Sequence, residues 1–76
     1  MAARLLECMT IRELQDRPEL QLITDSQDVQ QVKRLVGGRA RGYDGFLAST
    51  YTGDVTEAWG FKGNVPFLDK LACRVR

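Results

Sequence analysis

The fold class is decided by residues 46–61, which run F-L-A-S-T-Y-T-G-D-V-T-E-A-W-G-F. The two halves of this stretch, 46–51 and 55–61, are rich in β-branched and aromatic residues, which favour strands. Between them lies Thr52-Gly53-Asp54, a three-residue loop whose glycine can adopt a positive φ. The stretch therefore predicts an antiparallel hairpin over residues 46–61.

Two further segments have the alternation of strands. In residues 70–75, Leu71, Cys73 and Val75 fall on one side, and the cations Lys70 and Arg74 fall on the other. A shorter alternating run from Leu20 to Thr24 follows Pro18. We expect 70–75 to be the third strand of the sheet and 20–24 to be another short strand.

A helix is predicted over residues 26–36, because apolar residues recur there every three to four positions. Its apolar stripe consists of Val29, Val32, Leu35 and Val36. The residues that can cap its first amide groups are Thr24, Asp25 and Ser26. Gly37-Gly38 supplies a left-handed stop at the other end.

The first seventeen residues allow two interpretations. Leu5, Leu6, Met9 and Leu14 fit one face of a single helix over about residues 3–17, ended by Pro18. The alternative follows from Thr10-Ile11-Arg12-Glu13, which matches a capping box and indicates a helix that starts only at Thr10, after a strand. We favour the single helix.

These elements predict one α+β domain over residues 1–76. A small antiparallel sheet, made of the hairpin 46–61 and the strand 70–75, would be covered on one face by the two helices, 3–17 and 26–36. A chain of 76 residues has a thin core, because a domain of this size buries only roughly 60–65% of the surface that its unfolded chain exposes.

The two cysteines, Cys8 and Cys73, have no metal-binding spacing, and the chain contains no histidine, so no zinc site is expected. We expect a cytoplasmic protein with two reduced, partly buried thiols. The sequence does not show whether the two cysteines meet. No apolar run is long enough to span a membrane, and the first residues do not form a signal peptide.

Catalysis is not expected. Without histidine, the chain lacks the usual general base at neutral pH and the usual activator of a serine or cysteine nucleophile. The glycines between Gly37 and Gly45 match neither a Walker loop nor G-x-G-x-x-G, so no nucleotide or other cofactor is predicted.

The charge is distributed unevenly. Residues 1–32 carry a net charge of −3, from three cations and six anions, and residues 33–76 carry +4, from eight cations and four anions. The stretch 33–46, K-R-L-V-G-G-R-A-R-G-Y-D-G-F, holds four of these cations and four glycines. Such an asymmetry orients a charged partner during encounter.

The predicted partner-binding residues are of the types that dominate protein interfaces, together with the two cations that precede them. They are Lys33, Arg34, Arg39, Arg41, Tyr43, Tyr51 and Trp59. Lys33 and Arg34 also suit the negative end of the helix dipole, and Trp59 also suits a core position.

The sequence thus predicts a small non-enzymatic module that binds a larger protein or ribonucleoprotein complex, as a stoichiometric inhibitor. In size and in lacking catalytic residues it is similar to small phage-encoded inhibitors of host defence, including anti-CRISPR proteins, although no motif supports a closer relation. The alternative is an RNA- or DNA-binding domain that uses the basic loop 33–46, with Tyr43 or Phe46 stacked on bases. We also expect an exposed strand edge at residues 70–76, which is compatible with a homodimer because unpaired edges invite pairing, although its cations discourage it.

Overall fold

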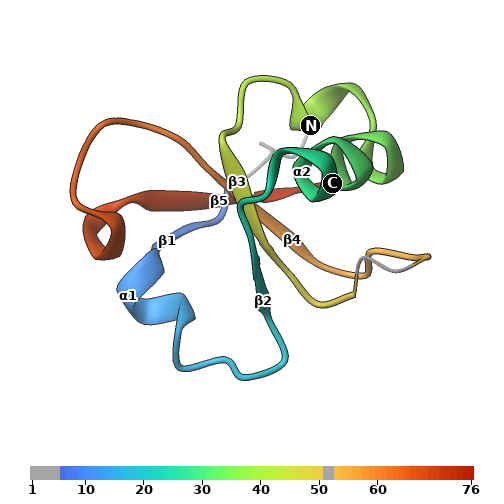
Figure 1. The fold of residues 1–76 in the computed structure, drawn as a ribbon. Helices are drawn as coiled ribbons and strands as arrows, with labels where there is room; N and C mark the ends of the chain where they lie inside the picture. Colours follow the sequence, from blue (N-terminus) through green and yellow to red (C-terminus); the bar gives the residue numbers. More distant parts are fainter. Residues whose placement is uncertain (1–5, 51–52) are drawn as a thin grey trace, which may run out of the picture.

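The computed structural model describes residues 6–50 and 53–76, which form a small α+β fold (Figure 1). Its strands are β1 (Cys8–Thr10), β2 (Gln21–Ile23), β3 (Gly45–Ala48), β4 (Ala58–Phe61) and β5 (Leu71–Val75). Its α-helices are α1 (Ile11–Leu14) and α2 (Ser26–Val36), and two short 3₁₀ turns are η1 (Gly38–Ala40) and η2 (Phe67–Asp69). The strands make one antiparallel sheet in the order β1-β5-β4-β3-β2, so the predicted fold class is confirmed.

The hairpin is confirmed as the pairing of β3 with β4, with Leu47 opposite Trp59. This register is the one that a turn centred on Gly53 produces. The regular strands are shorter than predicted, because the ladder ends at Ala48 and Ala58, followed by one bond from the Ser49 N–H to the Glu57 carbonyl at 2.9 Å. Part of the connecting loop, residues 51–52, lies outside the described residues.

The strands predicted at 20–24 and 70–75 are confirmed as β2 and β5, but the predicted open edge at 70–76 is wrong. β5 lies inside the sheet, between β1 and β4. The edge strands are β1 and β2. The reason is that the N-terminal segment contributes a strand, and this strand occupies the outer side of β5.

Helix α2 has the predicted bounds. The Asp25 side chain accepts a hydrogen bond from the Gln27 N–H at 2.9 Å, and Gly37, at φ 97°, ends the helix. Val29 and Val32 are buried against the sheet. Within residues 6–50 and 53–76, no helix combines the length and apolar character needed to cross a membrane.

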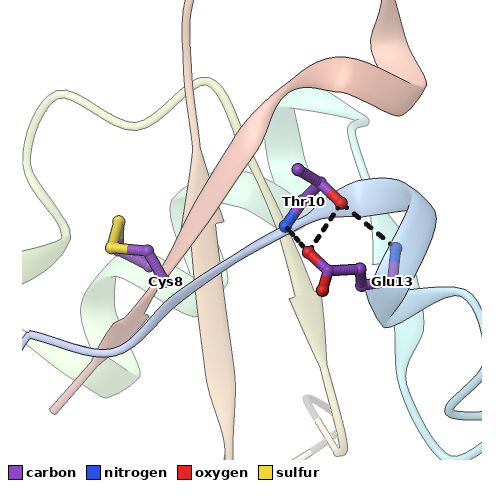
Figure 2. Close-up of a disulfide and its surroundings, with 4 residues drawn as sticks. Cys8, Thr10 and Glu13 are labelled. Carbon is purple, nitrogen blue, oxygen red and sulfur yellow. Dashed lines mark hydrogen bonds between the residues drawn. A yellow bond between two sulfur atoms is a disulfide. The ribbon is translucent and has the colours of Figure 1, made fainter.

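The single helix predicted over residues 3–17 is wrong, and the alternative is correct. Residues 8–10 form β1, and α1 begins only at Ile11, while residues 3–5 lie outside the described part. Figure 2 shows the capping box: Thr10 Oγ1 accepts from the Glu13 N–H, and the Glu13 carboxylate accepts from the Thr10 N–H at 3.0 Å. The backbone hydrogen bond from Thr10 lowers the pKa of Glu13. These local bonds start the helix about two turns later than the apolar spacing indicates.

The prediction that helices cover one face of the sheet is also wrong, because both faces are covered. All residues of β3 and β4 are buried, so neither face of the central hairpin is exposed. One cluster lies under α2 and consists of Ile23, Val29, Val32, Ala40, Phe46, Ala48, Ala58 and Val75. The other lies under α1 and η2 and consists of Ile11, Leu14, Leu20, Leu47, Trp59, Phe61 and Ala72. Figure 1 shows α1 and α2 on opposite sides of the sheet.

Glycine is required at position 60 by close aromatic packing. The ring of Tyr43 lies on Gly60, and a Cβ at this position would come within 2.6 Å of two ring atoms, Cγ and Cδ1. Tyr43 also packs against Phe46, with 5.9 Å between ring centroids. The middle of β4 therefore has no side chain of its own on the α2 face, and Tyr43 fills the space.

The cysteines are not reduced thiols: Cys8 and Cys73 form a disulfide, which corrects the sequence prediction (Figure 2). The two residues are direct partners in the pairing of β1 with β5, with their Cα atoms 4.1 Å apart. The bond joins positions 65 residues apart. Its physical origin is the placement of β1 beside β5, a long-range contact that residue spacing does not reveal.

We predict that Gly60→Ala lowers the free energy of unfolding by about 1–3 kcal/mol, because the added methyl group displaces the Tyr43 ring from a packed position. Urea titration measures the effect. The matched control is Gly38→Ala, where an added Cβ meets nothing within 4 Å. Equal stability of the two variants would contradict the packing described for Tyr43.

Removal of the disulfide is expected to cost about 2–5 kcal/mol of stability, because the cross-link restricts a long loop in the unfolded chain. The comparison is between the oxidised protein and Cys8→Ser/Cys73→Ser in urea titrations, with intact mass establishing the oxidation state. An unchanged unfolding midpoint would show that the strand pairing alone holds β1 in place.

Candidate partner-binding surface

Four of the predicted binding residues lie at the end of α2 and in the turn that follows. Lys33 and Arg34 are in the last turn of the helix, the first half-buried and the second exposed. Arg39 lies in η1 and Arg41 directly after it, and both are exposed. Gly37 and Gly42, at φ 97° and 91°, reverse the chain on either side of η1. We call Lys33, Arg34, Arg39 and Arg41 the basic patch.

The four cations of the basic patch, like Arg76, form no ion pair among the described residues, whereas Arg12, Arg17 and Arg74 do. Arg12 pairs with Asp69, Arg17 with Glu19 and Glu57, and Arg74 with Glu7, at distances between 2.8 and 3.3 Å. Among residues 6–50 and 53–76, no carboxylate lies within 4.0 Å of a basic-patch cation. These four charges form no ion pair in the described part of the chain, so they are available to an anionic partner.

Tyr43 packs against the sheet and is also partly exposed at the surface. One face of its ring is occupied by Gly60, and the Lys62 ammonium group lies 5.7 Å from the ring centroid. The residue is half-buried, so part of it remains accessible. Phe46 is 0% exposed and lies in the core. The stacking of bases on Phe46, which the nucleic-acid alternative uses, is therefore incompatible with the folded chain.

Trp59 lies in the core, so the prediction that it binds a partner is not supported by its position. It is 1% exposed, its Nε1 donates to the Glu57 carboxylate at 2.5 Å, and the Arg74 guanidinium lies 5.7 Å from its ring. Its partner in the sheet, Leu47, is buried on the same face. Tyr51, the remaining predicted residue, lies outside the described part of the chain.

A groove brings Arg39 and Tyr43 together with residues from both ends of the described chain. It has a volume of about 650 Å³, and we call it the cationic groove. Its lining residues are Leu6, Glu7, Arg39, Tyr43, Arg74, Val75 and Arg76. The turn η1 and Tyr43 supply one wall, and the paired ends of β1 and β5 supply the other, since the Arg74 N–H donates to the Glu7 carbonyl at 2.9 Å.

Arg74 and Arg76 were not predicted as binding residues. The only sequence signal for them is the alternation in residues 70–76, which places cations on one side of a strand. That signal does not indicate that the strand ends beside η1. Their role in the groove follows from the position of β5 inside the sheet.

A half-buried carboxylate, that of Glu57, lies between Arg17 and Arg74. The Glu57 side chain is 12% exposed, and its oxygens lie 2.9 Å from Arg17 Nη2 and 4.0 Å from Arg74 Nη2. Burial raises the pKa of Glu57, but hydrogen bonds from Trp59 and Arg17 and the charges of Arg17 and Arg74 outweigh it, so its pKa lies below the ordinary value. Glu57 therefore stays ionised. Its carboxylate contacts Arg17, Trp59 and Arg74.

A second hollow of about 340 Å³ adjoins the cationic groove, because both are lined by Arg74, Val75 and Arg76. Its other lining residues are Leu35, Val36, Val55, Thr56, Glu57 and Ala58. Leu35 is 43% exposed, which gives this hollow an accessible apolar wall. Most of its remaining surface is polar, and we call it the second hollow.

No protein-family model, no curated protein and no solved structure matches this chain. Within the part of the chain that the structure describes, no group of three or more cysteine, aspartate or glutamate side chains is placed to hold a metal ion. The site is therefore characterised by its own geometry.

We predict that Glu57→Gln lowers the free energy of unfolding at neutral pH by about 1–3 kcal/mol, because the charged partner of Arg17 and Arg74 is lost. The folded-state pKa lies below the unfolded value near 4.5, so the stabilisation is complete above that pH and is lost as the pH falls through the folded pKa. The difference between wild type and variant should therefore narrow below pH 4.5 in urea titrations.

The control for this prediction is Asp69→Asn. Asp69 pairs with Arg12, but both side chains are more than half exposed, so the pair contributes little in water. A Glu57→Gln effect that is as small as the control, or that does not change with pH, would show that the Glu57 contacts do not stabilise the fold.

Proposed function

We propose that the protein is a small non-enzymatic binding domain that docks on an acidic surface of a larger protein or ribonucleoprotein complex. The observation that carries the proposal is the basic patch, four cations within residues 33–41 without an ionic partner among the described residues. Cations that form no ion pair within a fold steer an anionic partner and add specificity to a complex. Arg39 and Arg41 are the residues expected to contribute most, because both are exposed and arginine is enriched at binding hot spots.

The proposal extends to stoichiometric inhibition, by occupation of a surface that the larger machine needs. The chain has no histidine, and its small size leaves little room for a water-excluding catalytic cleft. Small phage-encoded inhibitors, including anti-CRISPR proteins, are the type of molecule we have in mind. This part of the proposal depends on size and composition alone.

Direct RNA or DNA binding is the second candidate, because the basic patch would also suit phosphate groups. The core position of Phe46 and the contact of Tyr43 with Gly60 count against it, since both restrict base stacking. We therefore place an acidic protein surface first. A homodimer stays a prediction, now through the edges β1 or β2.

The cytoplasm stays the compartment predicted from sequence. The Cys8–Cys73 disulfide weighs against it, because disulfides persist mainly in oxidising compartments and are rare in the cytosol. Docking through the basic patch does not depend on the compartment.

We predict that Arg39→Ala/Arg41→Ala weakens capture of the partner by roughly tenfold, because exposed ion pairs contribute about 0.2–1 kcal/mol each and 1.4 kcal/mol corresponds to a factor of ten. The measurement is affinity purification from the native cell, followed by titration of the identified partner. The matched control is Arg12→Ala/Lys70→Ala, which removes the same charge near α1 and η2, away from the patch.

Equal capture by the two double variants would reject the basic patch as the contact surface. Fluorescence anisotropy with single-stranded RNA and duplex DNA, at low and high salt, tests the second candidate. A complex that forms only at low salt and is lost in the patch variant would favour nucleic acid over protein.

A further inference from the structure

The cationic groove contains two arginine side chains that form no ion pair among the described residues. Its lining includes three arginines and one glutamate. Glu7 lies 3.0 Å from Arg74, and Glu57 also approaches Arg74, so the charge of Arg74 is compensated. Arg39 and Arg76 have no carboxylate within 4.0 Å in the described residues. The groove thus presents Arg39 and Arg76 to an anionic group.

Apolar side chains lie directly beside these charges. Leu6 is 71% exposed and lines the groove, and Val75 lines both the groove and the second hollow. Leu35, which is 43% exposed, lines the second hollow with Val36 and Val55, but most of the surface of that hollow is polar. Of these apolar side chains, Leu6 is therefore the one that lies exposed in the groove itself.

We propose that the cationic groove binds an extended acidic segment of the partner protein, with its carboxylates at Arg39 and Arg76 and a neighbouring apolar side chain against Leu6. This inference rests on the proposed function and assigns the chemistry of the partner. The planar guanidinium group matches a carboxylate in two parallel hydrogen bonds. A volume of about 650 Å³ lies within the roughly 300–1,000 Å³ of sites that enclose a small ligand or a few side chains.

A polynucleotide fits this surface less well. Its phosphates would suit Arg39 and Arg76, but the exposed apolar side chain of Leu6 offers nothing to a sugar–phosphate backbone. Tyr43 has one ring face against Gly60, which limits stacking on a base. A peptide, in contrast, supplies carboxylates and apolar side chains within a few residues of each other.

The test is selection of peptides from a random phage-displayed library on the oxidised, full-length protein, with binding of the labelled peptides then measured by fluorescence anisotropy. We expect selected sequences with Asp or Glu next to a large apolar residue. Arg39→Ala/Arg76→Ala should weaken them at least tenfold, and Arg12→Ala should leave them unchanged. Replacement of the acidic residues by Ser, or of the apolar residue by Ser, should each weaken the peptide.

Three results would overturn the inference. The first is selection of peptides without acidic residues, and the second is that no peptide binds the wild type more tightly than Arg39→Ala/Arg76→Ala. The third is that single-stranded RNA displaces the labelled peptide at a lower concentration than unlabelled peptide does. Far-ultraviolet circular dichroism and the urea midpoint establish that the variants are folded. Arg76→Ala separates the two proposals, because Arg76 lies in the groove and outside the basic patch. If Arg76→Ala retains full partner capture and Arg39→Ala/Arg41→Ala does not, the groove inference fails and the proposed function stands.

Discussion

The structure depends on the pairing of β5 with a strand on each side. This strand comes last in the sequence, yet β1 and β4 both hydrogen-bond to it. Because β1 lies beside it, Cys8 meets Cys73, Glu7 meets Arg74, and the N-terminal segment becomes one wall of a groove. Without this placement β5 would be an edge strand, the cysteines would be apart, and the groove would have only one wall.

The same arrangement explains how a chain of 76 residues forms an adequate core. Each face of the central hairpin is covered by a short element, so nearly every apolar residue of β3 and β4 is removed from water. Close packing compensates for the small number of core residues. Tyr43 lies on Gly60, and on the opposite face Phe61 lies on Gly45 in the same way. Trp59 lies at the margin of the second cluster, where the Glu57 carboxylate accepts a hydrogen bond from its indole N–H. The Arg74 guanidinium lies over the Trp59 ring and near the same carboxylate.

The sequence was sufficient to predict those elements whose bounds depend on residues close together in the chain. Helix 26–36 has an apolar stripe, an N-cap and a terminal glycine, and the structure reproduces its bounds. The hairpin register also follows from local turn chemistry. At the N-terminus two local signals conflicted, and the Thr10–Glu13 hydrogen bonds determined the helix start against the apolar spacing.

Features that depend on long-range contacts were not predictable. The disulfide, the second covered face and the contribution of Arg74 and Arg76 to the groove all require the order of strands, which residue spacing does not contain. Arg39 and Arg41 were chosen by residue type, and the structure places both at the surface, whereas Trp59 lies in the core, which residue type alone did not decide because an aromatic residue suits a core and an interface equally.

The Cys8–Cys73 bond closes most of the polypeptide into a covalent ring. A single cut by a protease anywhere between these residues would open the ring without releasing a fragment, so the two pieces would remain one molecule and could keep their strands paired. Loops are the most accessible parts of a small domain. With this disulfide, a cut in one of them breaks the backbone but does not release either piece.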